Sequence, residues 1–272
     1  MSPGIGLLVL AVTLAIFAWV GFRVRHHGGD LDDYVTARGS QGPGALGLSF
    51  YASGMGAWIL FAPPEVGAFV GLVAVIGYGV GAAGPYVAFA LLGPRMRRVV
   101  PAGHSLTEFV RIRFGRLFRT YVLVISVLYM FFFVTAELSA VGAVAAITSG
   151  LDVRVTILAV AVVTLAYTAY GGLRASLATD RWQAWLILGL LGIGAVATIA
   201  ALDSPREALT GSGLLAVGRV GVESAVTLVI AVTVANMFHQ GYWQRLWAAR
   251  DNATLGWGAA VGSALAAPTV AV

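Results

Sequence analysis

Long apolar runs separated by short polar segments dominate the chain. Each is about 20 residues long, the length of helix needed to cross ~30 Å of hydrocarbon. The runs lack the alternation of apolar and polar positions that marks a membrane β-barrel, and the backbone inside a bilayer must pair within a helix or a closed barrel. We therefore predict an all-α, polytopic membrane helix bundle of about eight transmembrane helices, over 3–22, 44–66, 70–93, 120–149, 155–172, 182–202, 223–244 and 254–272.

The run at 44–66 carries residues that a buried helix normally avoids. Its stretch YASGMGAWILFAPPEVG, at 51–67, contains Gly54, Gly56, two prolines and the carboxyl group of Glu65. Glycine destabilises a helix interior by about 1 kcal/mol relative to alanine, and proline removes an amide donor and collides with the preceding turn. Carbonyl groups freed by a break are costly in hydrocarbon unless something satisfies them. Bound Na⁺ does so in transporters with interrupted helices; a proline kink patched by neighbouring helices is the alternative.

A second run is interrupted by polar side chains. In VTLVIAVTVANMFHQGYWQRLWAARD, at 226–251, an otherwise apolar sequence contains Thr233, Asn236, His239 and Gln240. Amide side chains at membrane depth are costly unless they bond across helices or line a wet cavity. Two disturbed helices separated by four undisturbed ones are the pattern expected for the first helices of two repeats.

One carboxyl group lies deep inside an apolar run. Glu137, in YMFFFVTAELSAVG, belongs to the run at 120–149, where an ionised side chain costs a few kcal/mol. No arginine lies within the predicted spans, so we expect Glu137 to face a water-filled cavity or to be protonated. It could hydrogen-bond a solute that bears an amide or an amine, and a structural hydrogen bond to another helix is the alternative.

Composition and charge agree with a membrane protein and indicate its orientation. Of 272 residues 59% are hydrophobic and only 11% are charged, too little polar surface to cover a water-soluble domain. All 17 lysine-or-arginine positions are arginine, and with eight helices all but Arg154, Arg206 and Arg219 fall on one side. The positive-inside rule then predicts an extracytoplasmic N-terminus in the cell (plasma) membrane. The net charge of +5 reflects this topology, and no nucleic-acid partner is predicted.

Sequence patterns of enzymes are missing. The chain has no cysteine and four histidines, and these include no HExxH pair; there is also no GxSxG elbow and no GxxxxGK loop. A membrane-embedded hydrolase needs a nucleophile beside a base, and Glu137 is the one candidate base deep in a predicted span. We therefore predict a protein that is not an enzyme, with no catalytic residue.

Three stretches resemble motifs of the sodium:solute symporter family. YTAYGGLRASLATDRWQ, at 167–183, resembles the family signature, in which Tyr-Thr-x-x-Gly-Gly-Leu-Arg-Ala precedes Thr-Asp and a Gln. ASGMGAW, at 52–58, is similar to the family's sodium-site stretch, and HQGYWQRLWAARD, at 239–251, to the end of its substrate-lining helix. The resemblance covers nearly the whole chain in consistent order. It implies a leucine-transporter-type fold of two inverted five-helix repeats, preceded by one extra helix.

The resemblance also implies roles for single positions. The backbone carbonyl groups of Ala52 and Met55 would form half of a sodium site. The candidate solute-binding residues are Ser53, Gly54, Trp58, Glu137, Thr233, Asn236, Met237 and Gln240. Sodium:proline symporters of the family carry Asp and Ser where this chain has Gly54 and Gly56, which counts against a proline-type site.

The predicted organisation is a single membrane domain over 1–272. It comprises the extra helix, a first repeat over 44–202 and the start of a second repeat over 223–272, which looks truncated because the helix expected to donate the other sodium ligands would follow Val272. We predict sodium-coupled secondary active transport (symport) of a small polar organic solute across the cytoplasmic membrane. The partners are membrane lipid, the sodium ion and the solute, with no cofactor and no other metal. The alternatives are a proton-coupled carrier that uses Glu137 and a non-transporting fragment of such a symporter.

Overall fold

The chain folds into helices joined by short loops in a computed structural model that describes residues 1–24 and 30–271. In chain order the elements are α1 (Pro3–Arg23), α2 (Leu31–Thr36), α3 (Pro43–Gly54), the 3-10 helix η1 (Ala57–Leu60), α4 (Ala62–Val70), α5 (Leu72–Val99), α6 (Leu106–Ser149), α7 (Val153–Ala201), α8 (Pro205–Gly211), α9 (Arg219–Asn236), α10 (Gln240–Ala248) and α11 (Asn252–Ala271). None of the described residues forms a strand, and the predicted all-α class is confirmed.

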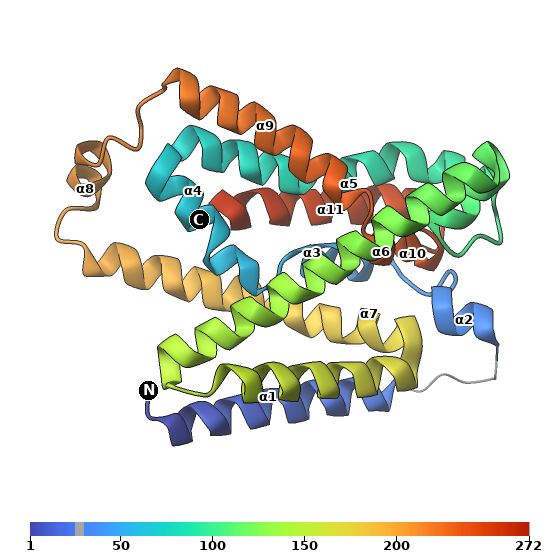
Figure 1. Cartoon of the computed structure of the whole chain (residues 1–272), viewed down its shortest axis with the longest axis horizontal. Coiled ribbons are helices and arrows are strands. Elements are labelled where there is room, and N and C mark those ends of the chain that lie inside the picture. The colour runs from blue at the N-terminus through green and yellow to red at the C-terminus, as the bar shows by residue number, and fades with distance from the viewer. Residues whose placement is uncertain (25–29, 272) are drawn as a thin grey trace.

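Several of these helices can cross a bilayer. Among the described residues, α1, α5, α6, α7 and α9 are long and apolar enough, and α3 with η1 and α4 forms a sixth, bent candidate. The 49 residues of α7 would extend about 70 Å as a straight helix, which is far more than one crossing requires. The chain turns back at Gly172, where φ is 59° and ψ is −151°, so α7 accounts for both predicted spans over 155–172 and 182–202 (Figure 1).

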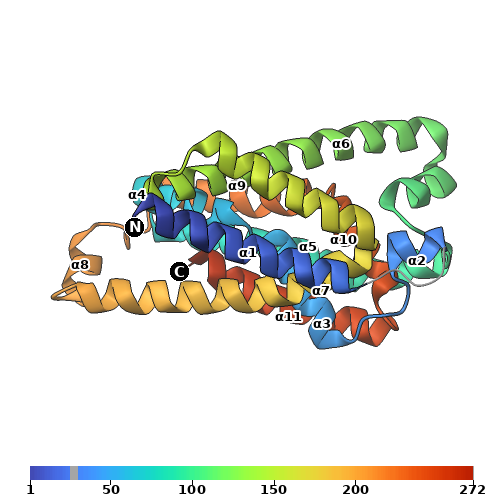
Figure 2. The same cartoon turned by 90° about the horizontal axis from the view of Figure 1, so that it is seen from below.

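The helix α5 lies at the centre of the bundle, packed against α9 on one side and α11 on another (Figures 1 and 2). Small residues allow this close approach. A Cβ atom at Gly77 would lie 2.5 Å from the Ala225 Cα, and one at Gly81 would lie 2.7 Å from the Leu228 carbonyl oxygen. α3 packs against both α11 and α7, and α1 covers α7 from outside. The broken helix α3–α4 is therefore held among other helices.

The two ends of the bundle differ in charge. The N-terminus, α8 and the end of α11 lie at one end, and α2, α10 and the turn within α7 lie at the other (Figure 1). The first end carries the three arginines predicted to be extracytoplasmic, at the start of α7, in α8 and at the start of α9. Arg38, in the loop after α2, and the arginines of α5, α10 and their loops lie at the opposite end, whereas Arg25 lies outside the described residues. The arrangement agrees with the predicted grouping of charge.

Two glycines with positive φ give a matched test of the α7 turn. Gly172 has φ of 59° and Gly115, inside α6, has φ of 87°. A side chain at either position suffers backbone strain of order 1–3 kcal/mol. A Cβ at Gly172 would also overlap the Tyr34 carbonyl oxygen, whereas Gly115 has no atom within 4 Å. We expect Gly172→Ala to lower the apparent melting temperature of the purified protein in detergent clearly more than Gly115→Ala. Equal shifts would contradict the tight packing of the turn.

Candidate ion and solute site

The predicted interruption of the second apolar run lies between α3 and η1. α3 ends at Gly54, Met55 and Gly56 are extended, and the helices on either side are bent by 59°. Among the described residues, no hydrogen bond reaches the carbonyl oxygens of Ala52, Ser53 or Met55. The prediction that this helix is broken is confirmed, and the break leaves peptide oxygens without partners.

The carboxyl group of Glu137, from α6, lies against this break. Its Oε2 accepts a hydrogen bond from the Ala57 amide at 2.8 Å. The absence of a side chain at Gly56 makes space for the Glu137 carboxyl group, because a Cβ atom there would overlap it. The other oxygen, Oε1, is buried and has no hydrogen-bond partner among the described residues. In this conformation Oε1 is shielded from water. The carboxyl group thus contacts the backbone of the break, and does not face the water-filled cavity that was one expectation from the sequence.

Two further predicted solute residues bond to α3 itself. Trp58 folds back over the break, where its Nε1 donates to the Gly54 carbonyl oxygen at 3.0 Å, and its ring stacks on Tyr78 at 5.5 Å between centroids. The Ser53 hydroxyl donates to the Ser49 carbonyl oxygen at 2.6 Å. The Trp58 side chain therefore lies against the break, and the Ser53 hydroxyl is hydrogen-bonded within its own helix.

The second predicted interruption separates α9 from α10. α9 ends at Asn236 and α10 begins at Gln240. The Tyr129 hydroxyl donates to Asn236 Oδ1 at 2.9 Å, and Trp243 Nε1 donates to the Met237 carbonyl oxygen at 2.7 Å. The Asn236 amide oxygen, on a side chain predicted to be costly in this run, thus has a partner, and so does the Met237 carbonyl oxygen.

Two predicted residues of the same run point to other helices. Thr233 Oγ1 donates to the Gly81 carbonyl oxygen of α5 at 3.2 Å. Gln240 Nε2 donates to Ser126 Oγ of α6 at 2.7 Å, and Gln240 lines a hollow of about 370 Å³ between α6 and α10. These two side chains lie apart from the group at the α3 break.

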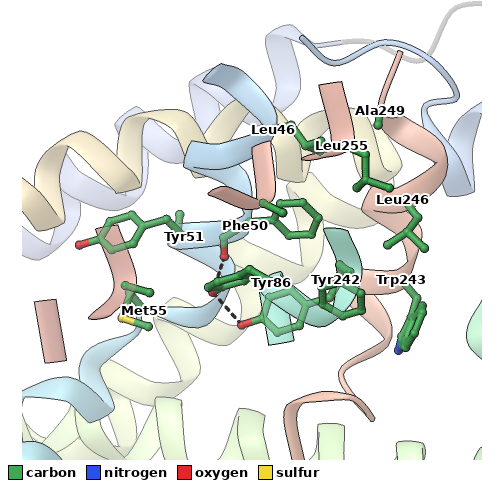
Figure 3. Close-up of a cluster of buried hydrophobic side chains, with 14 of the residues drawn as sticks. Leu46, Phe50, Tyr51, Met55, Tyr86, Tyr242, Trp243, Leu246, Ala249 and Leu255 are labelled. Atoms are coloured by element: carbon green, nitrogen blue, oxygen red, sulfur yellow. Dashed lines mark hydrogen bonds between the residues drawn. The ribbon is translucent and has the colours of Figure 1, made fainter. Parts of the chain in front are cut away.

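The two breaks meet at Tyr242. Its hydroxyl lies 3.3 Å from that of Tyr86, which donates to the Phe50 carbonyl oxygen at 2.9 Å; Figure 3 shows these groups in line. Gly54 packs directly against the hydroxyl groups of Tyr86 and Tyr242, because a Cβ atom at this position would overlap both. On its other side the Tyr242 ring stacks on His239, between α9 and α10, at 4.2 Å between centroids. The two disturbed helices predicted from the sequence are therefore neighbours in space.

One face of α6 runs along both breaks. Tyr129, Phe133 and Glu137 follow one another at helical spacing, so they share this face. Tyr129 bonds Asn236 and Phe133 meets the His239 ring edge-on at 5.1 Å, both at the second break. Glu137 bonds at the first break. Of these three, only Glu137 is among the predicted solute residues, although helical spacing places Tyr129 and Phe133 on the same face.

A buried ion pair holds the end of the site nearest the arginine-rich loops. Asp180 of α7 and Arg245 of α10 pair at 2.7 Å, with side chains only 8% and 4% exposed. Ser49 of α3 joins them: its hydroxyl donates to Asp180 Oδ2 at 2.5 Å and accepts from Arg245 Nε at 2.7 Å. Asp180 and Arg245 belong to the family-like stretches at 167–183 and 239–251, but nothing in the sequence indicates that they pair. This network connects the broken α3 to α7 and α10.

Comparison with known proteins agrees with this geometry. The model of the sodium:solute symporter family matches residues 34–244. The chain belongs to the sodium:solute symporter family. Over 235 residues it is 33% identical to a spermidine transporter of Candida albicans, covering 86% of this chain and 44% of that protein. Over 181 residues it is 28% identical to the high-affinity proline transporter PutP of Bacillus subtilis, covering 63% of this chain and 38% of that protein.

The chain therefore spans less than half the length of these curated relatives. Its fold matches that of a Na⁺-coupled sialic acid symporter solved in a substrate-bound outward-open state, with a TM-score of 0.84 at 16% identity, over 98% of this chain and 60% of that one. The predicted family and symporter fold are confirmed. Membership in a transporter family likewise confirms the prediction that the protein is not an enzyme.

Proposed function

We propose that this protein performs sodium-coupled symport of a small polar organic solute across the cell membrane. The observation that carries the proposal is the break after Gly54, which leaves carbonyl oxygens of α3 without hydrogen bonds inside a helix bundle. Such oxygens are costly in an apolar setting. Neutral peptide oxygens also suit a monovalent cation, and interrupted helices hold Na⁺ in this way in secondary transporters.

The proposed ion ligands are the carbonyl oxygens of Ala52 and Met55. Both residues are almost fully buried, at 8% and 3% exposed, so Na⁺ would replace hydrogen bonds that water cannot provide there. Its binding would fix the angle between α3 and η1. Gly54 and Trp58, whose indole nitrogen donates to the Gly54 carbonyl oxygen, would lie beside the ion.

The proposed solute site lies where the two breaks meet. Gly54, Trp58 and Glu137 would contact the solute from the first break, and Asn236 and Met237 from the second. Ser53, Thr233 and Gln240 remain proposed members that would have to exchange their present hydrogen bonds for the solute. Relatives named for spermidine, proline and sialic acid support a small polar organic solute as the class.

The proposed orientation places the arginine-rich end in the cytoplasm and the N-terminus outside. A membrane potential then adds about 2.3 kcal/mol per 100 mV to the inward movement of each positive charge. Sodium binding would stabilise the conformation that accepts solute, and rocking of the bundle would expose the site on the other side.

Uptake into proteoliposomes tests this function. The chain is reconstituted, and uptake of radiolabelled spermidine, proline, sialic acid, glucose and acetate is measured with an inward Na⁺ gradient or with choline in its place. We expect the Na⁺ gradient to stimulate uptake of at least one of these solutes several-fold. Uptake driven by a pH gradient and indifferent to Na⁺ would favour the proton-coupled alternative. Absence of uptake under every gradient would refute transport by this chain.

A further inference from the structure

Only one of the two carboxyl oxygens of Glu137 accepts a hydrogen bond from the described residues. Oε2 accepts from the Ala57 amide, and Oε1 is buried with no partner among the described residues. A carboxylate oxygen buried without a donor destabilises the conformation that contains it. A ligand that brings a hydrogen-bond donor, and above all a positive charge, would therefore bind there with the largest gain.

No side chain of the described residues supplies that charge. The arginines near the breaks are already committed, since Arg245 pairs with Asp180, and Arg174 pairs with Asp33. The amide donor at Ala57 is neutral. The α3 break therefore presents one acidic group that has no basic partner among the residues described.

Aromatic rings lie near this carboxyl group and at the second break. Phe133 lies one helical turn from Glu137 and stacks with Tyr129 at 6.0 Å between centroids. Its edge meets His239, whose Nδ1 is also buried without a partner in the described part of the chain. The Trp58 ring lies at the break itself, where its Nε1 donates to the Gly54 carbonyl oxygen. Aromatic faces attract organic cations, most strongly where water is excluded.

We propose that the transported solute carries an organic ammonium group and that Glu137 is its counter-charge at the junction of the two breaks. This inference rests on the proposed transport function and names its substrate class. A neutral or anionic solute would leave the Glu137 carboxyl uncompensated. An ammonium group donates to Oε1 and contacts the aromatic rings through its adjoining methylene groups.

Binding of a matched pair of ligands to the purified chain in lipid nanodiscs tests this proposal at a fixed Na⁺ concentration. The probes are radiolabelled putrescine and butanediol of the same chain length, which differ in amine versus hydroxyl ends. We expect saturable putrescine binding that a large excess of butanediol does not displace. Glu137→Gln should weaken binding roughly 10- to 100-fold, the loss expected for a hydrogen bond to a charged group.

Glu65→Gln is the matched control, because Glu65 is an exposed carboxylate in the first turn of α4. It should leave putrescine affinity unchanged. Displacement by butanediol in the unmodified chain, equal affinities of the two variants, or absence of putrescine binding would each overturn the proposal. Loss of radiolabelled Na⁺ binding in Glu137→Gln, measured without solute, would assign the carboxyl to the ion and overturn it as well. Putrescine binding without Na⁺-driven uptake would refute coupled transport but leave recognition of the ammonium group standing.

Discussion

Arg245→Met is expected to lower the free energy of unfolding by about 3–5 kcal/mol, the cost of removing one partner from a buried ion pair. The substitution leaves the Asp180 carboxylate, only 8% exposed, without its guanidinium partner. It also removes the donor that Arg245 gives to Ser49. The loss is measurable as a lower melting temperature of the purified protein in detergent.

The control for this prediction is an exposed ion pair of the same type. Arg219 pairs with Glu223 at 2.6 Å, but the side chains are 89% and 61% exposed, and such pairs contribute little. Arg219→Met should therefore leave the melting temperature unchanged. A double variant, Arg245→Met with Asp180→Leu, should recover much of the lost stability, because no buried charge remains unpaired. An Arg245→Met protein as stable as the Arg219→Met protein would show that the network does not hold α3.

Gly54→Ala is expected to damage both stability and sodium binding. The added methyl group would overlap the hydroxyl groups of Tyr86 and Tyr242, which are 0% and 2% exposed and therefore cannot swing into solvent. Overpacking of this kind costs about 1–3 kcal/mol. Moving Tyr86 would also break its hydrogen bond to the Phe50 carbonyl oxygen. The unfolding temperature and the affinity for radiolabelled Na⁺ should both fall.

Gly44→Ala is the matched control in the same helix. No atom lies within 4 Å of a Cβ built at Gly44, and alanine is favoured over glycine in helices. This variant should keep or slightly raise the melting temperature and bind Na⁺ as the unmodified chain does. Equal stability and equal Na⁺ affinity of Gly54→Ala and Gly44→Ala would contradict the close packing of Gly54 against Tyr86 and Tyr242.

The helices and their breaks could be predicted because their causes are local in sequence. Glycine and proline interrupt α3, polar side chains mark the end of α9, and both interruptions appear at the predicted places. The turn inside α7 differs in detail: the sequence suggested a loop between two spans, whereas helix continues on both sides of Gly172. One glycine with positive φ is enough to reverse the chain there.

The partners within the site could not be predicted, because they are distant in sequence. Glu137 bonds the amide of Ala57, 80 positions away, and Tyr242 meets Tyr86, 156 positions away. Hydropathy places Glu137 within an apolar span but contains no information on which helix it faces. For the same reason the sequence could not show that the predicted solute residues lie in separate places. Thr233 bonds to α5, whereas Gly54 and Trp58 lie together at the α3 break.

In the proposed mechanism the break in α3 binds Na⁺ through the carbonyl oxygens of Ala52 and Met55. Equilibrium binding of radiolabelled Na⁺ to the purified chain in nanodiscs tests it most directly. We expect a saturable component that unlabelled Na⁺ displaces and K⁺ does not, and this component should be weaker in Gly54→Ala and unchanged in Gly44→Ala. Sodium binding that never saturates, or that is identical in these two variants, would contradict it.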